Sequence, residues 1–384
     1  MRHSRWCSIT VVFTCLFVHA VSASESNVSP LTAGEWHKLL RQAQHGNHKA
    51  QIRVAFAFQN GEVVKQDSSE ARKWFLKAAE AGHPIAEHHL GVMFYSGMGG
   101  ERSPVEALKW FERAAAAGLA EAQFNAALMY ESGSGIAKNF GKALELYGQA
   151  AKNGYPRAQN NLGQMYENGE GIPRNLETAM KWYRKSAEQG SPIAEFNIGN
   201  MYLHGSGVHQ DYAEASKWLT LAAEQGDAKA QHLLGDLYQL GRGVPRDEQA
   251  AVQWLRKAAD QGYAAAELML GVLYLGGQGV SQDDSVAAEW FAKAAEQGDL
   301  EAQANLANLY EMGRGVSRDL SRAYLWRLLS LDTSTPQNDE KLRKLASQLS
   351  KTDLAEAEHR ASEWRVAHAA HPAELENLSP VPIQ

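Results

Sequence analysis

The chain has 384 residues, of which 44% are hydrophobic and 21% charged, and a formal net charge of −6. This composition is that of an ordinary folded protein and excludes a globally disordered chain. The acidic balance argues against a nucleic-acid partner, which needs a basic stripe, and against docking on anionic lipid.

Residues 1–23 are predicted to be a secretory signal peptide. Arg2 and Arg5 make the start basic, a short apolar run follows, and small residues precede a cleavage position after Ala23. The alternative is a short signal anchor. Beyond this segment no apolar run is long enough to span a bilayer, so the mature chain is expected to have no membrane span. The expected location is periplasmic or secreted.

Loss of the signal peptide changes the chemistry of the chain. Both cysteines, Cys7 and Cys15, lie inside it, so disulfides, thiolate nucleophiles and cysteine zinc sites are excluded from the mature chain. Removing Arg2 and Arg5 leaves 36 basic residues against 44 acidic ones, a net charge of −8.

Residues 24–46 are predicted to form an N-terminal capping helix. Thr32 and Glu35 have capping-box spacing, residues 33–45 follow as a helix, and Gly46 ends it.

A 36-residue repeat then runs through residues 47–334. Each repeat carries an alanine, here called the register alanine, at the same place: Ala50, Ala86, Ala122, Ala158, Ala194, Ala230, Ala266 and Ala302. Four register positions hold 28 of the 33 glycines. This period and the regularly recurring glycines predict an all-α, right-handed α/α superhelical solenoid of about eight helix-pair repeats with helical caps.

The first helix of each pair, helix A, has recognisable start and stop signals. In the fifth repeat Ser191 is a candidate N-cap, and Pro192 suits the first helical position. Gly199 is expected to let a neighbouring helix approach closely. Gly205 and Gly207 stop the helix, because glycine adopts the left-handed conformation without strain.

The second helix, helix B, is expected to begin at a polar N-cap and to bury an apolar stripe. In the fifth repeat this stripe contains Ala215, Trp218 and Ala222. The cap position holds a good N-cap residue in every repeat: Asp67, Ser103, Asn139, Asn175, Asp211, Asp247, Asp283 and Asp319.

The pattern resembles the Sel-one-like repeat, a branch of the tetratricopeptide superfamily. Residues 158–169 (AQNNLGQMYENG), 171–172 (GI) and 179–183 (AMKWY) carry the resemblance, which covers about residues 47–330. The first repeat departs from it with Val63 in place of the second loop glycine. One branch of the family is cysteine-rich and linked to penicillin binding and hydrolysis. This chain lacks the paired cysteines of that branch, so that activity does not transfer.

Residues 335–371 are predicted to be a C-terminal helical cap. The last helix B runs to a break at Pro336, and helices follow at about 338–349 and 353–369, with Thr352 as the cap of the second. Apolar residues give this segment a side that covers the solenoid end: Leu342, Leu345, Leu349, Leu354 and Trp364. Residues 372–384 are expected to be a flexible tail.

No catalytic constellation stands out in the sequence. Phosphate loops, His-Glu-x-x-His zinc motifs and Gly-x-Ser-x-Gly elbows are absent, and the Gly-x-Gly elements recur in register as helix stops. His83, His88 and His89 cluster in one repeat, where a metal site with Glu87 competes with an ordinary structural role. We expect no enzyme activity, no cofactor and no metal.

By the resemblance, helix A lines a concave groove that binds a peptide or protein segment. The groove positions lie two, three, six and nine residues after the register alanine. They give the candidate partner-binding residues His89, Asn125, Asn161, Asn197, Asn160, Gln164, Asn200, Leu268 and Met269. An amide can both donate to and accept from a peptide backbone. The alternatives are that the asparagines bridge helices and that Leu268 and Met269 belong to the core.

Glutamine or glutamate follows every register alanine, from Gln51 to Gln303, which favours a structural role at that position, such as tying helix A to a neighbouring loop.

The chain is therefore interpreted as an exported scaffold for protein–protein interaction in the bacterial envelope. By resemblance, such proteins act in envelope assembly, exopolysaccharide regulation, motility or host contact. The first alternative is a peptidoglycan- or glycan-binding module that uses aromatics such as Phe124 and Phe196. The second is a hydrolase.

Overall fold

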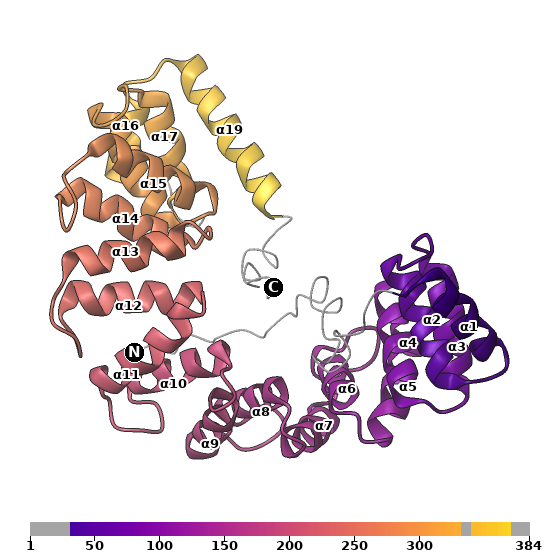
Figure 1. Ribbon diagram of the computed structural model, residues 1–384. Helices are drawn as coiled ribbons and strands as arrows, with labels where there is room; N and C mark the ends of the chain where they lie inside the picture. The colour runs from indigo at the N-terminus through magenta and orange to yellow at the C-terminus, as the bar shows by residue number, and fades with distance from the viewer. Residues whose placement is uncertain (1–30, 332–338, 370–384) are drawn as a thin grey trace. The chain divides into compact units, whose positions relative to one another are not determined.

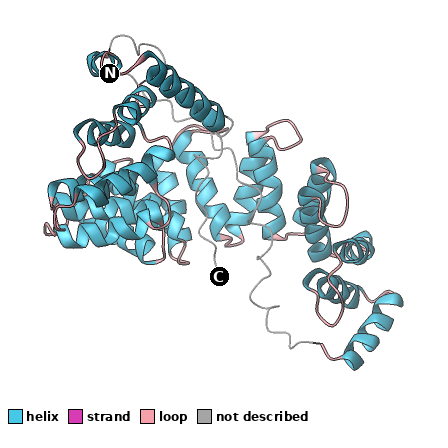
Figure 2. Cartoon of the chain, turned by 90° about the horizontal axis from the view of Figure 1, so that it is seen from above, coloured by secondary structure: helices cyan, strands magenta, loops and turns pink. Residues whose placement is uncertain are grey.

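The computed structural model of the chain describes residues 31–331 and 339–369. Over these residues the protein has nineteen helices and no strand (Figure 1). Figure 2 shows the same helices joined by loops alone in the described parts. The predicted signal peptide, Pro336 and the tail 372–384 lie outside the described residues.

The helices follow one another through short loops. α1 precedes the repeats, the even-numbered helices α2–α16 are helices A, the odd-numbered helices α3–α17 are helices B, and α18 and α19 follow. Their bounds are α1 Ala33–Gln44, α2 His48–Asn60, α3 Ser68–Glu80, α4 Pro84–Ser96, α5 Pro104–Ala116, α6 Ala120–Ser132, α7 Phe140–Lys152, α8 Pro156–Asn168, α9 Leu176–Ala187, α10 Pro192–His204, α11 Tyr212–Glu224, α12 Ala228–Leu240, α13 Glu248–Ala259, α14 Ala264–Gly276, α15 Asp284–Glu296, α16 Leu300–Met312, α17 Leu320–Leu329, α18 Glu340–Ala346 and α19 Lys351–Ala369.

The chain divides into two compact units, Met1–Gln189 and Gly190–Gln384, here called the N-terminal and C-terminal units. Within each unit a helix packs chiefly against the helices before and after it in the chain. The stacked helix pairs α4–α5 and α14–α15 illustrate this order in Figure 1. The predicted all-α solenoid of helix pairs is confirmed.

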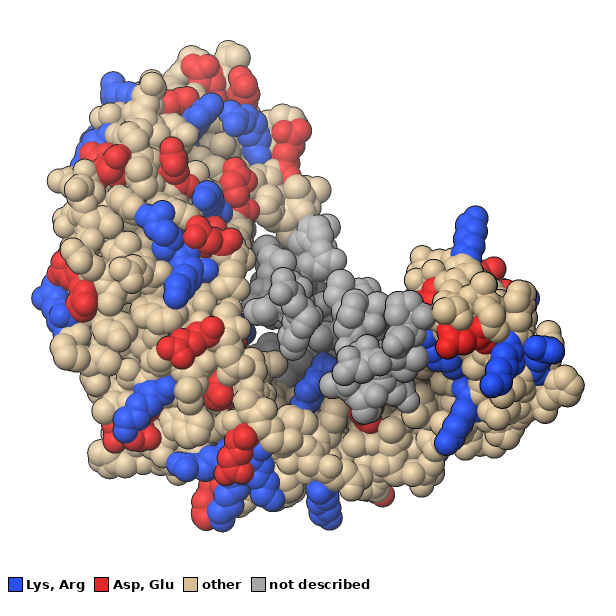
Figure 3. All heavy atoms as spheres, in the orientation of Figure 1, with Lys and Arg blue, Asp and Glu red and all other residues tan. Residues whose placement is uncertain are grey.

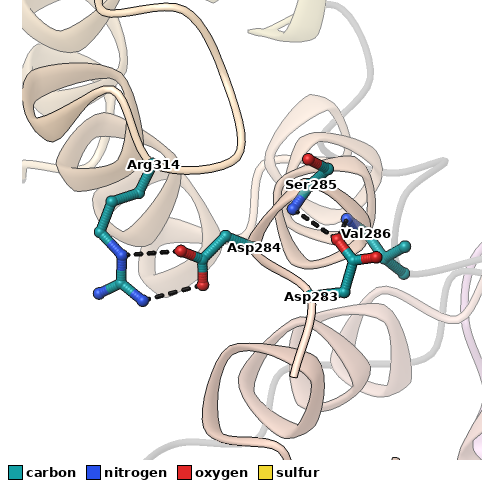
Figure 4. A network of polar contacts seen from close by, with 5 residues as sticks. All are labelled: Asp283, Asp284, Ser285, Val286 and Arg314. Carbon is teal, nitrogen blue, oxygen red and sulfur yellow. Dashed lines mark hydrogen bonds and ion pairs between the residues drawn. The ribbon is translucent and has the colours of Figure 1, made fainter. Parts of the chain in front are cut away.

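The predicted N-caps of helix B are confirmed in all eight repeats, where each side chain accepts a backbone N–H of the first turn. In Figure 4, Asp283 accepts from the amides of Ser285 and Val286 at 2.9 and 3.0 Å. Ser191 was expected to cap helix A in the same way. It stands at the N-cap of α10 but makes no side-chain cap hydrogen bond, whereas the longer side chain of Asp227 reaches the amide of Ala230.

The glycine-containing loops fasten each repeat to its neighbour. Gly313 ends α16 with a left-handed φ of +68°, and Gly315 follows at +67°. A Cβ on Gly315 would lie 2.0 Å from the carbonyl oxygen of Asp284, so only glycine fits against the start of α15. Between these glycines Arg314 makes a bidentate contact of 2.9 and 2.8 Å with the Asp284 carboxylate (Figure 4). The loop after one helix A thus docks on helix B of the preceding repeat.

The position after the helix B tryptophan is the most deeply buried part of the apolar stripe. Trp218, which was expected in this stripe, is half-buried, while the next position is fully buried in seven repeats. Its occupants are Phe75, Phe111, Tyr147, Tyr183, Leu219, Leu255 and Phe291. This side chain packs on the helix A glycine, since a Cβ on Gly199 would lie 2.8 Å from Leu219 Cγ. The expected close approach at Gly199 is confirmed.

Five of the helix B tryptophans are covered by cations. Lys77, Lys185, Lys257 and Lys293 place their ammonium groups 3.9–4.4 Å from the ring centroids of the tryptophans three residues before them. The apolar ring therefore packs inward on one face and meets a cation on the other.

The two ends of the described chain carry helical caps. The Thr32–Glu35 capping box of α1 is present. At the other end α17 ends at Leu329, and α18 and α19 are shorter and longer, respectively, than expected. Thr352 is not the cap of α19, because the helix begins at Lys351 and Ser350 accepts from the Asp353 amide at 3.1 Å. Leu342 and Leu345 are buried, as the capping role predicts.

Candidate functional site

The residue that follows each register alanine, here called the bridging residue, joins consecutive repeats where it is glutamine. It is buried in every repeat. Where it is glutamine, its Nε2 donates to a carbonyl oxygen at the end of the preceding helix, as Gln123 does to Ala115 at 3.2 Å. In three of these repeats its Oε1 also accepts from a side chain thirty residues later, as Gln159 does from Gln189 at 2.9 Å. The structural role expected at this position is confirmed, with the end of a helix as the contact rather than a loop.

In the N-terminal unit, two predicted groove asparagines make hydrogen bonds inside the protein. Asn125 is buried, and its Nδ2 lies 2.9 Å from Nε2 of His88. Because an amide nitrogen only donates, Nε2 accepts and the imidazole proton sits on Nδ1. Asn161 donates to the Tyr147 hydroxyl at 3.1 Å. These bonds are the helix bridges of the alternative interpretation.

Tyr147 is the centre of a polar network that sequence reasoning missed. Its ring is fully buried, and its hydroxyl donates to Oε2 of Glu131 on α6 at 2.5 Å while it accepts from Asn161 on α8. Tyr183 donates likewise to Glu167 at 2.6 Å. Burial raises the pKa of the Glu131 carboxyl. The sequence signal was present: tyrosine replaces phenylalanine or leucine at this core position in these two repeats alone.

His89, the first of the candidate binding residues, is packed among aromatic rings. It stacks on Phe75 with 5.1 Å between centroids and meets Phe56 edge-on at 4.8 Å. Burial lowers the pKa of His89 to about 4. The pKa of His88 is lowered to about 3, by burial and by the charge of the neighbouring His89. Glu87 does not pair with these histidines, because its carboxylate contacts Arg113 at 2.8 Å.

The remaining candidates are partly accessible or packed. Asn160 is buried and donates to Asn161 Oδ1 at 3.4 Å, while Gln164 on the same helix is half-buried. In the C-terminal unit the half-buried candidates are Asn197, Asn200, Leu268 and Met269. Leu268 and Met269 pack against buried clusters of α14 and its neighbours, so they also contribute to the core.

A histidine–carboxylate pair lies on α12. His232 Nε2 is 3.8 Å from Asp236 Oδ2, and the imidazole meets the Tyr263 ring edge-on. Burial lowers the pKa of His232 and raises that of Asp236, so burial opposes charge on both partners.

Of the two aromatic residues of the glycan hypothesis, Phe124 is covered by protein and Phe196 is half-buried. Phe124 is 2% exposed, between Tyr147, Tyr155 and the Arg157 guanidinium. A sugar-stacking ring has to present a face to solvent, so Phe124 is excluded from that role. Phe196 is half-buried against the core of α11 and α12.

Residues 31–331 and 339–369 hold neither a metal-binding cluster nor a membrane-spanning helix. They contain no group of three or more His, Cys, Asp or Glu residues placed to hold a metal ion. No helix among them has the length and apolar character needed to cross a bilayer. In Figure 3 the visible faces carry Lys and Arg interspersed with Asp and Glu.

Comparison with known families decides the identity of the repeat. The Sel1 repeat matches eight consecutive segments, at residues 48–83, 84–119, 120–155, 156–191, 192–227, 228–263, 264–299 and 300–326. The chain belongs to the Sel1 repeat family. Sel1 repeat proteins generally mediate protein–protein interactions, and the family is generally non-enzymatic.

Two solved Sel1-type structures are similar over most of the chain. A protective antigen of uropathogenic Escherichia coli strains with an SLR fold is 32% identical, covers 91% of this chain and 75% of its own, and has a TM-score of 0.77. A Sel1 repeat protein of Oxalobacter formigenes is 33% identical, covers 85% of this chain and 95% of its own, and has a TM-score of 0.65. No curated protein matches the chain.

Proposed function

We propose that this Sel1 repeat protein is an exported scaffold of the bacterial envelope that binds a peptide or protein segment along its A helices. Export is supported by the basic start, apolar run and small residues of the segment 1–23. It is also supported by the similar E. coli protein, a protective antigen, because an antigen has to be accessible to antibodies.

The observation that carries the binding surface is the accessibility of polar and apolar side chains at equivalent positions of the A helices. In the N-terminal unit Gln164, on the same helix as Asn161, is half-buried. In the C-terminal unit Asn197 and Asn200 of α10 are half-buried, as are Leu268 and Met269 of α14. The amides suit an extended backbone, and the apolar pair suits side-chain anchors.

Not every candidate residue can be substituted to test this surface without also disturbing the fold. Asn125 and Asn161 hold internal hydrogen bonds, so their removal tests folding as well as binding. Gln164 and Asn200 are better probes. A partner that co-purifies with the tagged chain from envelope extracts should bind the double variant Gln164→Ala/Asn200→Ala about tenfold more weakly in calorimetry, as expected for lost hydrogen bonds.

The matched control is Lys181→Ala on α9, whose side chain is exposed and pairs only with Glu177 at the surface. It should leave affinity unchanged. Equal affinity of the double variant and the wild type would contradict the proposed surface. Binding to purified sacculi with no protein partner would favour the glycan module, and turnover of an ester, amide or β-lactam by the pure chain would favour the hydrolase.

Export has a separate test. Mass spectrometry of the chain recovered from its native host should find a mature N-terminus at Ser24, immediately after the predicted cleavage position. Recovery of the uncleaved chain from the cytoplasm would contradict it.

A further inference from the structure

One hydrogen bond between consecutive repeats can be compared across the chain, because it is made by the bridging residue. In five repeats the bridging residue is glutamine, and its Nε2 donates to the carbonyl oxygen eight residues before it at 3.0–3.2 Å. In the other three repeats the residue is Glu87, Glu195 or Glu267. An ionised carboxylate has no proton to donate, so it cannot make this bond.

Glu267 on α14 shows the consequence within the C-terminal unit. Its side chain is buried, and Oε2 accepts from Gln297 Nε2 on α15 at 2.7 Å. This reproduces the accepting half of the glutamine pattern. The donating half would be directed to the carbonyl oxygen of Ala259 at the end of α13, and the ionised side chain leaves it unmade.

At Glu87 an arginine makes the hydrogen bond that the carboxylate cannot make. Arg113 on α5 places Nη2 2.8 Å from the Glu87 carboxylate and also donates to the carbonyl oxygen of Ala79 at 3.1 Å. The arginine therefore neutralises the carboxylate and satisfies the carbonyl that a glutamine would have bound.

The cations around Glu267 are engaged elsewhere. Lys293 occupies the register position of Arg113, but its ammonium lies 3.9 Å from the Trp290 ring centroid. On α13, Lys257 lies over Trp254 at the same distance. Glu267 forms no ion pair with any of the described residues.

We propose that the junction between α13 and α14 is a pH-sensitive joint: protonated Glu267 donates to the carbonyl oxygen of Ala259, as glutamine does in five repeats, and so tightens the junction in acid. The proton comes from solvent and stays on the carboxyl. Burial raises the pKa of Glu267, and the Gln297 hydrogen bond and Lys293 oppose that rise.

The direction of the pH effect follows from linkage. A carboxyl whose folded pKa exceeds its unfolded value of about 4.3 binds more protons in the folded protein. Its contribution to stability is present in full below the unfolded value and is lost as pH rises through the folded pKa. The joint is therefore loosest at neutral pH. Because a solenoid is held by nearest-neighbour interfaces, loosening one junction permits local opening there.

The test compares hydrogen exchange of the α14 amides in the full chain at about pH 4, below the unfolded pKa of a glutamate, and at about pH 7.5, corrected for intrinsic exchange rates. Protection in the wild type should be roughly fivefold higher at the lower pH, the size expected for one hydrogen bond. The variant Glu267→Gln should lose this fivefold difference. Glutamine stands at this position in five repeats, so the variant is expected to fold.

Two comparisons isolate Glu267 from other groups. The His232–Asp236 pair faces Tyr263 at the start of α14 and also titrates, but it is unchanged in Glu267→Gln. The reverse variant Gln231→Glu should create the same pH dependence at the α11–α12 junction. Retention of the wild-type pH dependence by Glu267→Gln, or its absence in Gln231→Glu, would overturn the proposal.

Discussion

Val63 is the residue at which the first repeat departs from the other seven. It has a φ of +52°, the sole positive value among the described non-glycine residues. A β-branched side chain is strained in this region, which glycine adopts freely. The departure was visible in the sequence, but the strain was not, because it depends on the loop keeping the same backbone path without its glycine.

Val63→Gly should raise the free energy of unfolding of the N-terminal unit by about 1 kcal/mol, since relief of left-handed strain exceeds the added chain entropy. Urea denaturation measures it. Val64→Gly is the matched control and should destabilise, because Val64 packs against the core and has no positive φ. A loss of stability in Val63→Gly would show that the loop is not strained.

His88 and His89 predict acid sensitivity of the N-terminal unit. Their folded pKa values of about 3 and about 4 lie below the unfolded value of about 6.5. The unfolded chain therefore binds more protons, and stability falls as pH drops from about 6.5 toward 4, by up to about 1.4 kcal/mol per pH unit for each histidine. Denaturation midpoints measured across this range should show a shallower fall for His89→Phe than for the wild type. An unchanged slope would mean that His89 is solvated in the native state.

At the scale of the helix, the bridging residues explain an unpartnered atom. Oε1 of Gln51 is buried without a hydrogen-bond partner. In later repeats the donor comes thirty residues downstream, from Asn153, Gln189 or Gln261. In the first repeat that position is Ala81.

Ala81→Gln should therefore stabilise the N-terminal unit by about 1 kcal/mol, by satisfying a buried acceptor. Ala81 has φ −81° and ψ 3°, nearly the values of Gln225 at the equivalent position, so the new side chain starts from the same backbone. Ala81→Met has similar size and no donor. Thermal melting of both variants measures the difference, and equal melting temperatures would refute the bond.

The Tyr147 network makes a second prediction for helix contacts. Asn161→Ala and Tyr147→Phe should each destabilise the N-terminal unit. Their effects should be non-additive by about 1 kcal/mol in a double-mutant cycle, because both remove the same hydrogen bond. Additive effects would contradict the bridging role of Asn161.

The elements were predictable from the sequence, whereas the partners of individual side chains were not. The N-caps from Asp67 to Asp319 were predictable because capping is local, between residues two or three apart. Tyr147, Glu131 and Asn161 come from three helices, so only the packed structure brings them together. The contact of Leu219 with Gly199 was missed for the same reason, since a helical period assigns a face but does not say which of two adjacent residues meets the glycine of the preceding helix.

At the scale of the molecule, both units repeat one construction. A helix pair is closed by a glycine loop, joined to its neighbours by the bridging residues, and leaves partly accessible side chains along its A helices. This construction suits the proposed interaction scaffold, in which each repeat would add its own contacts to a partner.

Site-specific photo-crosslinking in the native host tests this account most directly. A photoreactive residue at Gln164 or Met269 samples the A helices of each unit, and one at the exposed Lys181 or Glu289 samples a B helix of the same unit. We predict a covalent adduct of the same protein partner from Gln164 and Met269, and none from Lys181 and Glu289. Equal adduct yields from both sets of positions, or adducts from the B helices alone, would contradict it.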